Sequence, residues 1–126
     1  MDAARAPLRV LLVEDEALIA MLIEDQLIEL GFDVVGPAAT ATQAIALCEE
    51  EKIDGAVLDI NLGGGQRSDS VAELLAAKSI PFVFVTGYGS SGVDRRFAYA
   101  GVLQKPFTLP ELRDLVAGRF VRTDVS

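Results

Sequence analysis

Short apolar runs alternate with longer segments of helical periodicity along the chain. Five runs have the length and β-branched character of strands: 8–13, 32–36, 55–60, 81–85 and 102–104. Apolar residues recur at helical spacing in four segments, 16–30, 40–50, 70–78 and 108–118. Nearly continuous apolar strands are typical of a parallel sheet covered on both faces. The pattern therefore predicts an α/β fold of five βα units around one parallel sheet.

Local signals mark the ends of the predicted helices. Gly31 stands where a helix favours glycine just past its last turn. Three pairs match a capping box, and they are Thr40 with Gln43, Ser70 with Glu73, and Thr108 with Glu111. The segment 87–101 should hold the remaining helix, although its glycines and serines make it a poor helix former.

Length and composition indicate one globular domain. The 126 residues suit a single core, for which we expect residues 8–118, and only about eight residues follow the last helix, so we expect no output domain. The apolar runs are too short for a bilayer, and the N-terminus lacks the apolar region of a signal peptide. The single Cys48 excludes an internal disulfide framework. We therefore expect a cytoplasmic protein.

The charge and the missing histidines exclude several classes of function. A net charge of −8 disfavours binding to nucleic acid or to anionic membranes. The chain has no histidine. Histidine-dependent catalysis, a histidine-ligated zinc site and a phosphohistidine within this chain are thus excluded.

Ionisable and hydroxyl side chains gather where the predicted strands end. Glu14 and Asp15 follow the first strand, Asp59 ends the third, Thr86 the fourth, and Lys105 the fifth. Ligands of open α/β sheets bind outside these carboxyl ends, at a point where the strand order reverses. Three neighbouring carboxylates would repel one another, and a hard divalent cation such as Mg²⁺ would relieve that repulsion. With a lysine and a threonine beside them, they suit a phosphoryl group, and a carboxylate can itself form an aspartyl-phosphate.

Four motifs at these strand ends carry a family resemblance. LLVEDE, LDIN, FVTG and QKPF resemble the receiver domain of two-component response regulators, and the likeness covers nearly the whole chain. The resemblance implies a doubly wound, flavodoxin-like sheet with strand order 2-1-3-4-5. It also implies Asp59 as phosphoacceptor, with Thr86 and Lys105 contacting the phosphoryl group and a cis bond between Lys105 and Pro106.

The same resemblance implies a Mg²⁺ site. Glu14 and Asp15 would form its acidic pocket together with Asp59, with Asp15 the more direct ligand. Asn61 would contribute its backbone carbonyl. The glycines at 63–65 would leave the approach to Asp59 open, or would simply form a flexible loop.

The stretch PFVFVTGYG narrows the resemblance to single-domain receivers of the PFxFATGY ("FAT GUY") type, although Val85 replaces the motif's alanine. That group is tied to stress-response signalling in alphaproteobacteria. Many receivers carry an aromatic residue three positions before the lysine, where this chain has Val102. Tyr88 is a candidate substitute for it.

Three functions compete at this point. The leading one is a stand-alone response regulator, not an enzyme, which takes its phosphoryl group from a histidine kinase or phosphotransfer protein. It would signal through a downstream protein partner, or act as a phosphate shuttle or sink. The alternative is a Mg²⁺-dependent phosphohydrolase with an aspartate nucleophile, but Asn61 stands where such an enzyme needs a second acid. The third is a structural receiver that is no longer phosphorylated.

The first predicted helix carries more apolar residues than one buried face can hold. Met21 and Ile28 are seven positions apart and therefore share a face. We expect an exposed apolar patch there, used by a partner or in a dimer, and hence a monomer or weak dimer.

Overall fold

The computed structural model describes residues 6–87 and 92–121 of the chain. Five strands form one parallel sheet in the order β2-β1-β3-β4-β5, with the bounds β1 Arg9–Val13, β2 Asp33–Ala38, β3 Gly55–Asp59, β4 Phe82–Thr86 and β5 Gly101–Gln104. The four α-helices are α1 Ala17–Glu29, α2 Ala41–Glu50, α3 Asp69–Ala77 and α4 Leu109–Val116. The predicted flavodoxin-like fold and its strand order are confirmed.

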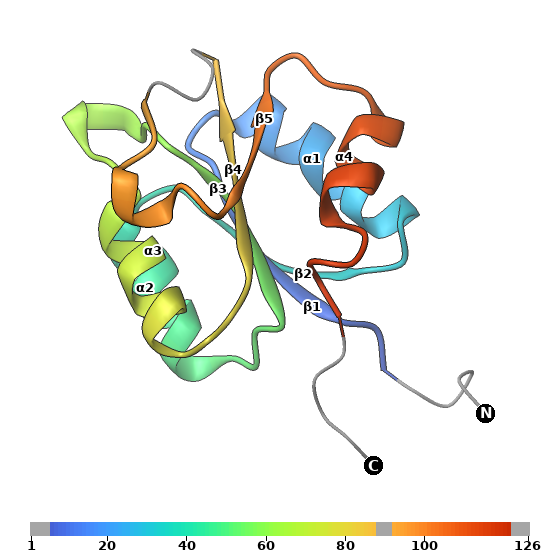
Figure 1. The fold of residues 1–126 in the computed structure, drawn as a ribbon, viewed down its shortest axis with the longest axis horizontal. Coiled ribbons are helices and arrows are strands. Elements are labelled where there is room, and N and C mark those ends of the chain that lie inside the picture. Colours follow the sequence, from blue (N-terminus) through green and yellow to red (C-terminus); the bar gives the residue numbers. More distant parts are fainter. Residues whose placement is uncertain (1–5, 88–91, 122–126) are drawn as a thin grey trace.

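The molecule has three layers, with the sheet in the middle. Helices α2 and α3 cover one face of the sheet, and α1 and α4 cover the other (Figure 1). Successive residues of β1 enter the two cores in turn: Leu11 and Val13 pack with α2 and α3, and Val10 and Leu12 pack with α1 and α4. Burial on both faces explains why the strands lack an alternating polar pattern.

The connection from β4 to β5 differs from the prediction. In the part that the structure describes, residues 92–100, a 3₁₀ turn at Arg95–Phe97 stands in place of the expected helix. Asp94 caps this turn by accepting a hydrogen bond from the backbone N–H of Arg96. Since β5 begins at Gly101, too few residues remain after Asp94 to continue a longer helix.

One of the three predicted capping boxes is complete, and a second is confirmed only as a helix cap. Thr108 and Glu111 form a complete capping box at α4. Thr40 caps α2, but the Gln43 side chain accepts from Ala39 N–H instead of returning to Thr40. The pair at Ser70 was wrong, because α3 already begins at Asp69, and Glu73 forms an ion pair with Arg96.

None of the described helices has both the length and the apolar character needed to cross a membrane.

Candidate functional site

The register of the sheet places the motif residues at the ends of neighbouring strands next to one another. Val13 pairs with Leu58, so the residues that follow them, Glu14 and Asp59, lie at neighbouring positions. Asp59 pairs with Val85, one residue before Thr86. The backbone N–H of Lys105 donates to the carbonyl of Thr86 at 2.8 Å. All of these residues therefore lie at the carboxyl edge of the parallel strands.

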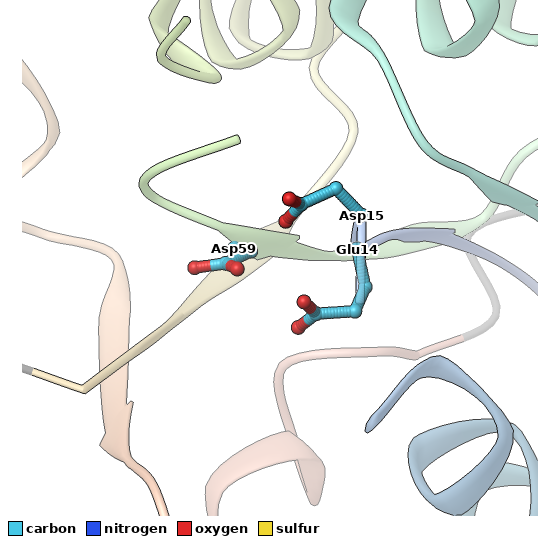
Figure 2. Close-up of side chains that lie close together, drawn as sticks. All are labelled: Glu14, Asp15 and Asp59. Atoms are coloured by element: carbon cyan, nitrogen blue, oxygen red, sulfur yellow. The ribbon is translucent and has the colours of Figure 1, made fainter. Parts of the chain in front are cut away.

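Three carboxylates meet at this edge. Glu14, Asp15 and Asp59 each offer a carboxylate oxygen, and these oxygens lie within 4.8 Å of one another (Figure 2). Glu14 and Asp59 are buried, while Asp15 is half-buried. The set consists of oxygen donors alone, which is the chemistry that Mg²⁺ prefers, so the residues fit the expected ion.

Lys105 lies against two of these acids. Its Nζ is 2.9 Å from Oε1 of Glu14 and 3.2 Å from Oδ2 of Asp59. The side chain of Glu16 comes within 4.0 Å of the same ammonium. The lysine thus supplies the positive charge that the buried carboxylates need.

The pKa values of Glu14 and Lys105 are both raised above their usual values. Burial raises the pKa of Glu14, the charge of Asp59 raises it further, and the hydrogen bond from Lys105 offsets these effects only in part. Burial alone would lower the pKa of Lys105, but its hydrogen bond to Glu14 and the charge of Asp59 raise the pKa above its usual value. The lysine therefore stays protonated at neutral pH.

A cleft of about 380 Å³ opens over the acidic cluster. Its walls include four predicted site residues, Asp15, Asp59, Asn61 and Lys105. Glu14 and Thr86 do not line it, and both are buried. Gly63, one of the glycines expected beside Asp59, also lines it, and three further lining residues were not predicted, namely Glu16, Leu62 and Gly87. Glu16 could have been inferred from its place directly after the acidic pair.

The glycine loop after β3 is built against Asp15. A Cβ placed on Gly63 would lie 3.0 Å from Oδ2 of Asp15, closer than such contacts normally come. Gly64 and Gly65 have φ values of 72° and 79°, the left-handed region that favours glycine. The loop is therefore glycine-rich for steric and backbone reasons, beyond the open approach or flexibility expected from sequence.

Two expectations concern the switch region beside the cleft. The peptide bond between Lys105 and Pro106 is cis, as the resemblance implied. Val102 is half-buried and pairs with Phe84 in the sheet. Tyr88, the candidate substitute for an aromatic residue there, lies outside the described residues.

Helix α1 exposes the apolar residues that its sequence could not bury. Met21 and Ile28 are 59% and 55% exposed, and Leu18 reaches 81%. A second, mostly apolar groove of about 290 Å³ is lined from the same helix by Ile19, Leu22 and Ile23, and from the other side by Lys105, Pro106 and Phe107. Because Lys105 lines both hollows, this groove borders the acidic cleft.

Similar proteins are response regulators. The chain is 34% identical over 114 residues to the transcriptional regulatory protein PdtaR of Mycobacterium tuberculosis, covering 88% of this chain and 55% of PdtaR. The chain thus spans about half the length of this curated relative.

Two solution structures of SdrG are also similar. SdrG from Sphingomonas melonis Fr1 is 48% identical with a TM-score of 0.82, over 93% of this chain and 99% of SdrG. The BeF3-activated conformation of SdrG, from Pseudomonas melonis Fr1, is 47% identical with a TM-score of 0.77, over 93% of this chain and 100% of that one. The family model of the response regulator receiver domain matches residues 10–117. The chain therefore belongs to the response regulator receiver domain family.

Proposed function

We propose that this receiver accepts a phosphoryl group on Asp59 from a phosphohistidine of another protein. One observation carries the proposal: the Asp59 carboxylate lines a cleft together with Asp15, and the ammonium of Lys105 lies 3.2 Å away. The donor would be a histidine kinase or phosphotransfer protein, because these 126 residues contain no histidine.

The transfer exchanges one bond to phosphorus for another. An oxygen of Asp59 attacks the phosphorus, the P–N bond to the donor imidazole breaks, and its electron pair stays on that nitrogen, which takes a proton from water. Lys105 offsets the negative charge of the transferring oxygens. Thr86 ends the neighbouring strand and would donate its hydroxyl to the phosphoryl group once Asp59 carries it.

Asp15, Asp59 and the backbone carbonyl of Asn61 would hold Mg²⁺ at this cleft, with Glu14 behind them. When bound, the ion supplies further positive charge at the phosphoryl oxygens. Asp15 suits the direct ligand position because it is the most accessible of the three acids, whereas Glu14 is already engaged by Lys105.

We further propose that the donor contacts the apolar residues of α1. The groove beside Leu22 borders the cleft through Lys105, so a protein seated there would reach Asp59. The exposed side chains of Leu18 and Met21 would then be covered. A second copy of the chain is the other expected occupant, as a weak dimer.

In the cytoplasm, the protein would signal through phosphorylation-dependent contacts with a downstream protein, or pass the phosphoryl group on as a shuttle or sink. The added charge of about −1.5 to −2 would change the surface around β4 and β5. Its likeness to the BeF3-activated form of SdrG makes beryllofluoride a suitable probe.

The test uses amide spectra with beryllofluoride and Mg²⁺, and acetyl phosphate as a covalent donor. We expect the signals around Asp59 and from Thr86 to Val102 to change in the wild type and not in Asp59→Asn. No change in the wild type would favour a structural receiver that is no longer phosphorylated. Steady turnover of a generic phosphate ester would instead favour the hydrolase that Asn61 disfavours.

A further inference from the structure

The loop that carries Asn61 is closed on itself next to the cleft. Asn61 and Arg67 form an isolated antiparallel bridge. Leu62 N–H donates to the carbonyl of Gln66 at 2.8 Å, and Ser68 N–H donates to that of Ile60 at 3.0 Å. Because these bonds cross the neck of the loop, the backbone of Arg67 is tied to the residue that would supply a carbonyl to the cation.

The side chain of Arg67 leaves this loop and reaches the β4–β5 connection. Its Nη2 donates to the carbonyl of Gly92 at 2.6 Å, across 25 positions of sequence. The same guanidinium makes a fork with Asp69, with N–O distances of 3.1 and 3.2 Å. Asp69 lies in the first turn of α3, so the helix fixes the arginine in its pose.

The far end of the same segment is anchored independently of the cleft. The ring of Phe97 is buried and lies 5.7 Å from that of Phe82. Arg96 donates to Glu73 of α3 at 2.6 Å and also bonds Asp94. Packing and ion pairs thus hold the segment 92–97 in place at residues 96–97, whereas Arg67 contacts its other end at Gly92.

We propose that Arg67 is a positioning residue that transmits the state of the acidic cleft to the segment 92–94. The inference rests on the proposed function, since the cleft changes state when Asp59 is phosphorylated. Entry of a phosphoryl group displaces the loop 61–67, and the guanidinium carries that displacement to the carbonyl of Gly92. The chain thereby has a link between cleft and surface that does not pass through position 102, where Val102 has replaced the aromatic residue.

The experiment compares Arg67→Ala with Arg96→Ala, which removes a similar exposed arginine from the remote end of the segment. Amide spectra are recorded with and without beryllofluoride and Mg²⁺. We expect the changes at 59–63 to persist in both variants. The changes at Gly92 and Val93 should fall by more than half in Arg67→Ala and persist in Arg96→Ala. Asp94 is left out of this comparison, because the Arg96 side chain bonds it directly.

Arg67→Lys provides a rescue. A lysine can donate to the carbonyl of Gly92 but cannot make the fork with Asp69, so we expect it to recover part of the response. Unfolding midpoints should be similar for all variants, because both arginine side chains are partly exposed. A response of wild-type size at Gly92 and Val93 in Arg67→Ala overturns the inference alone. Absence of changes at 59–63 in the wild type overturns the proposed function as well.

Discussion

The ammonium of Lys105 lies 2.9 Å from the carboxylate of Glu14, across 91 positions of sequence. Glu14 is buried and does not line the cleft, so this contact is part of the structural support of the site. Lys105 then reaches Asp59 with the same nitrogen. One lysine thus serves both a buried acid and the acid that faces the cleft.

Replacing Lys105 with Met leaves both acids without this cation. We expect the free energy of unfolding to fall by about 1–3 kcal/mol in urea denaturation, since a buried charged group loses its partner. The pKa of Lys105 is raised, so the stabilising charge is fully present below its usual value of 10.5 and is lost only as the pH rises through the raised value. The loss should therefore be the same at pH 7 and pH 9. A variant as stable as the wild type would contradict this.

Gly63→Ala should weaken Mg²⁺ binding. The added methyl would stand 3.0 Å from Oδ2 of Asp15, so that carboxylate must move. We expect a roughly three- to tenfold rise in the dissociation constant by calorimetric titration, about 0.7–1.4 kcal/mol. Gly87→Ala is the matched control, because Gly87 lines the same cleft and has nothing within 4 Å of its Cβ position. Equal effects of the two substitutions would refute the steric explanation.

Leu18→Glu should separate donor contact from phosphoacceptance. The side chain is 81% exposed, so we expect the free energy of unfolding to change by less than about 0.5 kcal/mol. Transfer from a histidine kinase should slow at least about fivefold if this surface is covered on binding, about 1 kcal/mol. Phosphorylation by acetyl phosphate needs no docked protein and should proceed unchanged. If phosphorylation by the kinase and by acetyl phosphate both slowed, the substitution would be acting on the chemistry at Asp59 and not on donor contact.

Cys48 should resist thiol reagents in the folded protein. It is buried in the core between α2 and the sheet, and burial raises the pKa of its thiol above the usual range. The reactive thiolate is thus scarce at pH 8 and inaccessible. A colorimetric disulfide reagent should react slowly with native protein and at once in denaturing urea. Rapid native labelling would show that α2 opens readily.

The stability effects of substitutions at capping residues should show whether helices begin where the structure has them or where the sequence predicted them. Thr108→Ala removes a side chain that accepts from Glu111 N–H, and we expect it to destabilise the protein by about 1 kcal/mol. Ser70→Ala should have almost no effect, since Ser70 lies inside α3 and is exposed. Thermal unfolding of both variants checks this. A large loss of stability in Ser70→Ala would indicate that the helix begins at Ser70, as the sequence predicted.

Much of the fold and part of the site could be predicted because they depend on local pattern. Alternating strand and helix periods predicted the parallel sheet, and acids directly after apolar runs predicted a cleft at the strand ends. The predicted helix was wrong at the β4–β5 connection, where helix propensity is weak and packing therefore determines the local structure. There the burial of Phe97 and the ion pair between Arg96 and Glu73 accompany the 3₁₀ turn at Arg95–Phe97.

By itself the sequence determined the class of fold and the residues available at the strand ends, and its lack of histidine excluded a phosphohistidine among these 126 residues. Only the tertiary structure decided that Lys105 pairs with Glu14, that a Cβ at position 63 would press on Asp15, and that Arg67 reaches Gly92. These contacts join residues 91, 48 and 25 positions apart. Sheet register and packing fix such distances, and no local periodicity encodes them.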